Sequence, residues 1–192
     1  MTSQRDLTET TLESKLVYEG KFLRLRKDLA RLPDGSTGTR EYIVHPGAAA
    51  MVPLFDDGRI LIERQFRYPL GREFIEIPAG KIDAGETSLQ TAQRELIEET
   101  GYRAEQWAFM TRIHPAIGFA DELIDVYLCK HLVHTEQKLD AGEFVEIEIV
   151  TLGWLMDQLK AGHLSDVKTQ IATMWLDNLY SGRWTWPSFS SA

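Results

Sequence analysis

The segment from Gly80 to Gly101 constrains the fold most, because a glycine-containing turn leads directly into one well-marked helix. Thr87 with Gln90 three residues later is typical of a capping box at a helix start, and Gly101 is typical of a helix end. Short strand-like runs lie on both sides of this helix, and two helical patterns close the chain. We therefore expect an α+β fold in which a mixed β-sheet is sandwiched between helices.

The remaining elements follow from alternating apolar patterns and turn residues. We expect strands before the helix at 16–32, 39–45, 45–55, 59–68 and 73–79, and after it at 107–113, 123–133 and 144–152. The turn at 33–38 would join the first two strands into a long hairpin. We expect the closing helices at 152–162 and 165–180, with Ser165 as the N-cap of the second. The predicted organisation is a flexible N-terminus (1–14), an N-terminal β-hairpin subdomain (15–45) and a main domain (46–192).

Composition excludes several classes of partner. The 192-residue chain has 29 acidic and 21 basic residues, a net charge of −8, which disfavours binding to nucleic acid or to anionic membranes. The N-terminus lacks the apolar core of a signal peptide, and no apolar run has transmembrane length. The single cysteine, Cys129, excludes an internal disulfide framework. We expect a cytoplasmic protein.

Three carboxylates gather where a helix least favours them. Glu95, Glu98 and Glu99 share one face at the helix end, where each acidic side chain costs about 0.3–1 kcal/mol. Arg94 is one turn before Glu98 and can orient it, but one cation cannot offset three charges. Divalent magnesium or manganese would, because both prefer oxygen ligands. Glu86, at the helix start, could join only if the preceding loop folds back; the alternative is a solvated acidic face.

The spacing of these residues resembles the Nudix box. The matching pattern is Gly80, five residues, Glu86, seven residues, and then the run from Arg94 to Tyr102. The resemblance implies the Nudix fold and hydrolysis of a nucleoside diphosphate linked to another group. It further implies that Glu95 and Glu99 bind Mg²⁺, with two or three ions per site and Mn²⁺ as a possible substitute. The remaining implied metal or water contacts are Glu98, paired with Arg94, and the carbonyl of Ala79.

Segments outside the box resemble the ADP-ribose and nucleoside-diphosphate-sugar pyrophosphatase subgroup. These segments are 39–54, 61–71, 73–80 and 114–128. The resemblance implies a homodimer in which the N-terminal strands, here within 15–45, exchange and complete the partner's site. The subgroup commonly has a Ser-Pro-Gly-like loop after the box. Here Pro115 precedes Ala116-Ile117-Gly118, so the identity of the sugar stays open.

The resemblance also suggests a general base and substrate contacts. The base is a glutamate on a loop before a late strand, which matches Glu143, with Glu146 as the rival. Arg67 could grip a phosphate by the two-pronged geometry of guanidinium. The remaining candidate substrate contacts are Phe22, Arg40, Glu41, Gly118 and Glu122. For each of these the alternative is ordinary packing or a solvated surface position.

The resulting hypothesis is Mg²⁺-dependent hydrolysis of the pyrophosphate bond of ADP-ribose or a related nucleoside diphosphate sugar. The products would be a nucleoside monophosphate and a sugar phosphate, with Glu143, Glu98 and Arg94 as the catalytic residues. Two alternatives remain open at this stage. One is a different enzyme substrate, namely GDP-mannose or a dinucleotide, and the other is a Nudix domain that senses a nucleotide sugar without cutting it.

Overall fold

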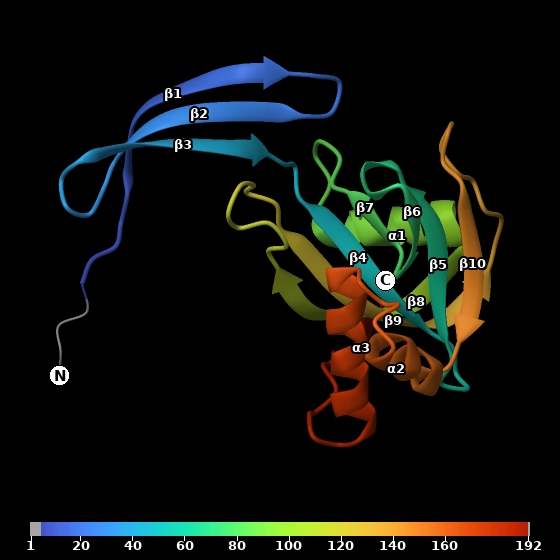
Figure 1. The fold of residues 1–192 in the computed structure, drawn as a ribbon. Coiled ribbons are helices and arrows are strands. Elements are labelled where there is room, and N and C mark those ends of the chain that lie inside the picture. The colour runs from blue at the N-terminus through green and yellow to red at the C-terminus, as the bar shows by residue number, and fades with distance from the viewer. Residues whose placement is uncertain (1–4, 192) are drawn as a thin grey trace. The chain divides into compact units, whose positions relative to one another are not determined.

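The computed structural model describes residues 5–191, which form two compact units (Figure 1). The first unit contains the residues before Gly47 together with Ala116–Leu123, and the second contains Gly47–Pro115 and the residues from Ile124 onward. Residues 1–4, which belong to the segment expected to be flexible, lie outside the described residues.

The first unit is a three-stranded antiparallel sheet rather than the expected hairpin. Its strands are β1 (Thr10–Glu19), β2 (Arg24–Arg31) and β3 (Thr37–Val44). The single strand predicted over residues 16–32 is wrong, because the chain turns at Gly20, whose N–H donates to the carbonyl of Leu23 (2.8 Å). β1 starts at Thr10, so residues 10–14 of the segment expected to be flexible are part of a strand.

The loop Ala116–Leu123 belongs to this first unit because it pairs with the end of β3. The N–H of Ile43 donates to the carbonyl of Phe119 (2.9 Å), and the N–H of Asp121 donates back to the carbonyl of Ile43 (3.2 Å). The side chain of Asp121 also accepts from the backbone N–H of His45 (2.7 Å). These bonds order a loop that would otherwise be a plain connection between strands.

The second unit is built on an eight-stranded sheet in the order β10-β5-β4-β9-β8-β11, with β6 paired to β5 and β7 paired to β4. β4 and β9 run parallel and the other pairs are antiparallel, so the expected mixed sheet is confirmed. The 3-10 helix η1 (Tyr68–Leu70) connects β5 to β6. The strands are β4 (Ala48–Leu54), β5 (Ile60–Arg67), β6 (Arg72–Glu76), β7 (Ala79–Lys81), β8 (Tyr102–Ile113), β9 (Ile124–His134), β10 (Val145–Val150) and β11 (Ser190–Ser191).

Helices cover both faces of this sheet (Figure 1). They are α1 (Ser88–Thr100), α2 (Leu152–Lys160) and α3 (Val167–Tyr180). Side chains of β4 alternate between the faces: Met51 packs with Leu96 of α1, while Val52 packs with Leu155 of α2 and Leu176 of α3. No helix among residues 5–191 is both long enough and apolar enough to cross a membrane.

The ends of α1 follow the sequence prediction, whereas the start of α3 does not. Thr87 and Gln90 form the reciprocal capping box, and Gly101 ends the helix with a φ of 69°. The N-cap of α3 is Asp166 and not Ser165, because the Asp166 side chain accepts from the N–H of Thr169 (3.0 Å). Both residue types suit this position, so the pattern alone did not separate them.

Candidate active site

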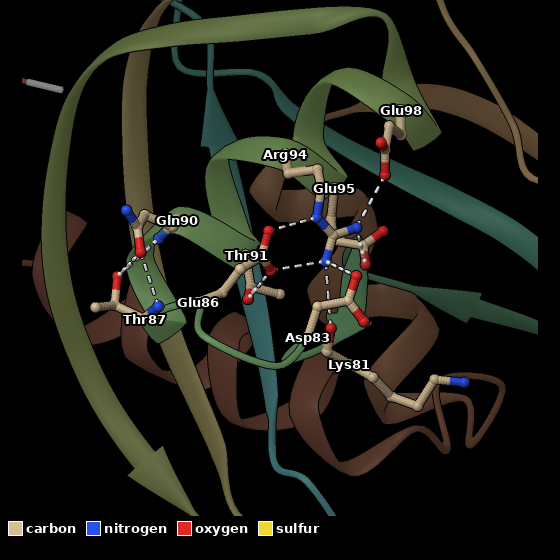
Figure 2. A network of polar contacts seen from close by, with 9 residues as sticks. All are labelled: Lys81, Asp83, Glu86, Thr87, Gln90, Thr91, Arg94, Glu95 and Glu98. Atoms are coloured by element: carbon tan, nitrogen blue, oxygen red, sulfur yellow. Dashed lines mark hydrogen bonds and ion pairs between the residues drawn. The ribbon is translucent and has the colours of Figure 1, made fainter. Parts of the chain in front are cut away.

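Arg94 lies among four carboxylates of α1 and the preceding loop, namely Asp83, Glu86, Glu95 and Glu98 (Figure 2). Its Nε and Nη2 donate to the two oxygens of Glu86 (3.0 Å each), and its Nη1 donates to Glu95 and Glu98 (2.9 Å each). The contact with Glu98 is the one expected from their i, i+4 spacing. These hydrogen bonds raise the pKa of Arg94, so the guanidinium is a permanent positive charge that offsets part of the repulsion among the carboxylates.

Glu86 contacts Arg94 and not the buried end of the helix. Besides both bonds from Arg94, its Oε2 accepts from the hydroxyl of Thr91 (2.8 Å). The hydrogen bonds from Arg94, followed by that from Thr91, lower the pKa of Glu86 to about 2. The loop therefore does fold back, as a metal ligand at this position would require. Its contacts are nevertheless those of a residue that orients Arg94.

Glu99 is the most buried carboxylate of α1, with 2% of its surface exposed. Its Oε2 accepts from the backbone N–H of Ala79 (3.1 Å), which joins the end of the helix to the start of β7. Burial, followed by the charges of Glu63, Glu95 and Glu143, raises its pKa to about 10. Such a carboxylate is costly to ionise unless a cation comes close to it.

Glu95 presses against the backbone of Gly80. A Cβ at residue 80 would lie 1.8 Å from Glu95 Oε1, so only glycine fits there. Burial raises the pKa of Glu95, partly opposed by Arg94. Glu95, Glu99 and the Ala79-Gly80 backbone are therefore gathered in one small region.

Glu63 is a residue of this region that the sequence analysis missed. It lies on β5 with 0% exposure, and neither of its carboxylate oxygens has a hydrogen-bond partner within the described part of the chain. Burial raises its pKa to about 8. The available signal was a glutamate directly after the apolar run Ile60-Leu61-Ile62. A charged residue at that position either ends the buried part of the strand or is itself buried, and a buried charge needs an explanation.

Glu143 and Glu146, the two candidate bases, have different surroundings. Glu143 lies in the turn before β10, after Gly142 with a φ of 90°, and its charge raises the pKa of Glu63, Glu95 and Glu99. Glu146 is 74% exposed and forms an ion pair with Arg64. The arrangement favours Glu143, since only its charge is among the principal influences on the buried carboxylates.

The residues of this region suit divalent cations, although no three Asp, Glu, His or Cys side chains among residues 5–191 already converge as ligands of one ion. Within the described part of the chain, Glu63 supplies two buried oxygens without a hydrogen-bond partner, and Glu99 accepts from one backbone N–H. The missing Cβ of Gly80 leaves space that Glu95 occupies. Carboxylate oxygens together with a nearby backbone carbonyl are the donor set that Mg²⁺ and Mn²⁺ prefer.

Arg67, predicted to grip a phosphate, contacts a second buried carboxylate. Its Nε and Nη2 donate to the two oxygens of Glu76 (2.6 and 2.8 Å), and Lys168 donates to Glu76 as well. The Arg67 side chain is still 40% exposed, so it is an oriented cation and not a freely moving surface residue.

The other five predicted substrate contacts all belong to the first unit. Phe22 and Glu122 both approach His45: the Phe22 and His45 ring centroids are 6.1 Å apart, and His45 Nε2 lies 3.7 Å from Glu122. Phe22 is 53% exposed, and a side chain added at Gly118 would meet open space.

Arg40 and Glu41 are held by other partners on the sheet of the first unit. Arg40 Nε donates to Glu9 (2.8 Å), and Glu41 forms an ion pair with Lys27 (3.2 Å). Adjacent residues of a strand point to opposite faces, so these two side chains do not lie together.

Comparison with known proteins identifies two family models in the chain. The NUDIX domain matches residues 44–169, and the nucleoside diphosphate sugar hydrolase N-terminal domain matches residues 9–43. An ADP-ribose pyrophosphatase of Bacillus subtilis (strain 168) is 40% identical over 174 residues, covering 90% of this chain and 94% of the relative. A methanol dehydrogenase activator of Bacillus methanolicus is 38% identical over 170 residues, covering 88% and 92%.

A solved structure supports the same fold. The crystal structure of an ADP compounds hydrolase superposes with a TM-score of 0.81 at 18% identity, covering 94% of this chain and 98% of the other. Hydrolases that contain a NUDIX domain generally use divalent metal ions, which agrees with the donor set described above. The domain match, the relatives and the fold together show that this chain is an enzyme of the Nudix hydrolase family.

Proposed function

We propose that this enzyme hydrolyses the pyrophosphate bond of ADP-ribose or a related nucleoside diphosphate sugar. The products are a nucleoside monophosphate and a sugar phosphate. The observation that carries the proposal is the buried Glu99, which accepts from the N–H of Ala79 and whose pKa is raised by burial and by the charges of Glu63 and Glu95. The full-length likeness to a relative named ADP-ribose pyrophosphatase supports this class of substrate.

Glu95, Glu99 and the carbonyl of Ala79 are the proposed ligands of two or three Mg²⁺ ions, with Mn²⁺ as a substitute. Glu98 adds a metal or water contact, and Arg94 orients it by donating to its carboxylate. Bound divalent ions would neutralise the pyrophosphate oxygens and stabilise the leaving phosphate. Glu86 acts through Arg94, because it holds the guanidinium with both oxygens.

Glu143 is the proposed general base, taking a proton from the attacking water. Its backbone N–H donates to the carbonyl of Asp140 (3.0 Å), and the positive φ of Gly142 sets the turn that carries it. Glu146 is the less favoured candidate, since Arg64 already neutralises it at the surface.

The proposed substrate contacts are Arg67 for a phosphate, Phe22 for the base and Glu122 for a ribose hydroxyl. Arg67 is oriented by Glu76 and partly exposed, and the ring of Phe22 is more than half exposed, which suits both roles. Arg40, Glu41 and Gly118 are further proposed contacts with the nucleotide.

We further propose a cytoplasmic homodimer formed by exchange of the N-terminal strands. Every residue of β1 is exposed, so this strand offers a long surface to a partner, and the matched N-terminal domain covers it. Light scattering coupled to size exclusion gives the mass in solution. A monomer at micromolar concentration would contradict this part of the proposal.

A panel of nucleotide substrates tests the function. The purified enzyme is incubated with Mg²⁺ and ADP-ribose, other nucleoside diphosphate sugars, GDP-mannose or dinucleotides, and the products are separated and identified. We expect a nucleoside monophosphate and a sugar phosphate from ADP-ribose or a close analogue, and no products with EDTA. Preference for GDP-mannose or a dinucleotide would reassign the substrate, and tight binding without cleavage would favour the sensor alternative.

A further inference from the structure

We propose that Glu63 of β5 is an additional anionic contributor to the cation site, outside the sequence motif that defines the family. This inference deepens the proposed function and depends on divalent cations binding beside Glu99. It gives Glu63 a role in cation binding, although Glu63 lies on β5 and the motif carboxylates Glu95 and Glu99 lie on α1.

The strand geometry directs Glu63 toward α1. Ile60 and Ile62 of β5 pack in the core shared with α2 and α3. Because side chains alternate along a strand, Glu63 points to the opposite face, which α1 covers. Glu99 is a buried residue of α1, and the charge of Glu63 raises the pKa of Glu99, which agrees with this placement.

The two cations whose charges act on Glu63, Arg67 and Lys168, are already bound to Glu76. Glu63 lies directly opposite Glu76 in the pairing of β5 and β6, and Arg67 and Lys168 both donate to Glu76. Neither oxygen of Glu63 has a partner among the residues that the structure describes, although the side chain is 0% exposed. A buried carboxylate without hydrogen bonds is destabilising unless a ligand satisfies it.

Other residues could fill this position more cheaply. On the strand β5, an apolar side chain such as those of Ile60 and Ile62 would pack without any cost of desolvation. A glutamate with free oxygens facing Glu99 therefore suits a second function, namely the binding of a positively charged ligand. A divalent cation fits that description, because it can contact two carboxylates at once.

Mn²⁺ binding to the full-length protein, measured by calorimetry and by electron paramagnetic resonance of free Mn²⁺, tests the inference without relying on turnover. The variants are Glu63→Gln, Glu63→Val in case the first does not fold, and Glu73→Gln as a matched control on β6. Glu73 is a 63% exposed carboxylate that pairs with Arg64. We expect both Glu63 variants to bind Mn²⁺ about 10–100-fold more weakly, and Glu73→Gln to bind like the wild type.

Thermal unfolding with and without Mn²⁺ separates this role from a structural one. In EDTA we expect the Glu63 variants to be at least as stable as the wild type, whereas with Mn²⁺ the wild type gains more. Unchanged Mn²⁺ affinity in both variants would overturn the inference, and so would an equal loss of stability with and without the ion. Wild-type protein that binds no Mn²⁺ would overturn both this inference and the cation site of the proposed function. Wild-type protein that binds Mn²⁺ but hydrolyses nothing in the panel would overturn the proposed function alone.

Discussion

Two buried glutamates face each other across adjacent strands and have opposite surroundings. Glu76 on β6 receives hydrogen bonds from Arg67 and Lys168, so its pKa is held below the ordinary value. Glu63 on β5, directly opposite, has no partner among residues 5–191, and burial raises its pKa. Burial alone therefore does not distinguish these two carboxylates; they differ in whether a cation of the described residues is bound to them.

The two arrangements also differ in what they connect. The ion pairs of Glu76 join β5, β6 and the first turn of α3, which stabilises the second unit. The unpartnered oxygens of Glu63 are near Glu99, which in turn is joined to the start of β7. We therefore expect changes on the Glu76 side to affect stability, and changes on the Glu99 side to affect catalysis.

The largest expected effect is on turnover in Glu99→Gln. The loss of a charged ligand removes several kcal/mol of cation stabilisation, which corresponds to a fall of about 10³-fold or more. Glutamine still accepts from the N–H of Ala79 and needs no cation, so the melting temperature in EDTA is expected to hold or rise. Steady-state hydrolysis measures the turnover, and calorimetry measures the melting temperature. Undiminished Mg²⁺-dependent turnover would falsify the assignment of Glu99 as a cation ligand.

Glu143→Gln comes next, because it removes a proton acceptor and leaves the cation ligands in place. We expect turnover to fall about 10²–10⁴-fold with Mn²⁺ affinity mostly kept. Glu146→Gln is the control, since that side chain lies at the surface on Arg64. Near-normal rates in Glu143→Gln together with a large fall in Glu146→Gln would transfer the role to Glu146.

Glu76→Gln tests the buried glutamate that is bound by cations of the protein. It removes the negative charge that binds both Arg67 and Lys168, although Lys168 keeps its ion pair with Asp166 (3.1 Å), and breaking such a buried pair costs up to about 3–5 kcal/mol. Urea unfolding measures the loss, and Glu63→Gln in EDTA is the matched variant on the opposite strand. Equal destabilisation by the two substitutions would remove the distinction between these glutamates.

The smallest expected effect is on the pH dependence of stability. The pKa of Glu76 is lowered in the folded state, so its contribution is present above its ordinary pKa of 4.5 and is lost as pH falls through the folded value. The pKa of Glu63 is raised, so in metal-free protein it disfavours folding increasingly as pH rises from 4.5 to about 8. Both stability gaps should narrow in acid but have opposite signs, because near neutral pH the wild type is expected to be more stable than Glu76→Gln and, without metal, less stable than Glu63→Gln. Parallel pH profiles of urea unfolding for the two pairs would contradict the comparison.

Much of the fold and the acidic face could be predicted because the signals are local. The capping box at Thr87, the ending glycine at Gly101 and the shared face of Glu95, Glu98 and Glu99 all depend on spacing within one helix. The strand patterns likewise predicted a mixed sheet between helices. Helix α3 was found with its N-cap misplaced by one residue, since neighbouring Ser165 and Asp166 are both suitable.

The rest depends on contacts between segments distant in sequence. The turn at Gly20 was hidden because apolar and charged residues alternate across it as they would along one strand. Glu63 and Glu99 are brought together only by the packing of α1 on the sheet. Likewise, Arg67 is held by Glu76, which is nine residues away on another strand, and the second cation bound to Glu76 is Lys168 of α3. No local periodicity reports such contacts.

The first turn of α3 has a practical consequence for where the chain can be shortened. Thr169 accepts from the N–H of Ile77 (2.8 Å) and Lys168 bonds to Glu76, so this turn anchors the strand end that leads to Ala79. The NUDIX domain match stops at residue 169, in the middle of that anchor. A truncation at that boundary would retain the anchoring side chains and delete the helix that presents them. We expect recombinant fragments to need the sequence through Tyr180 before the loop that carries the motif is ordered.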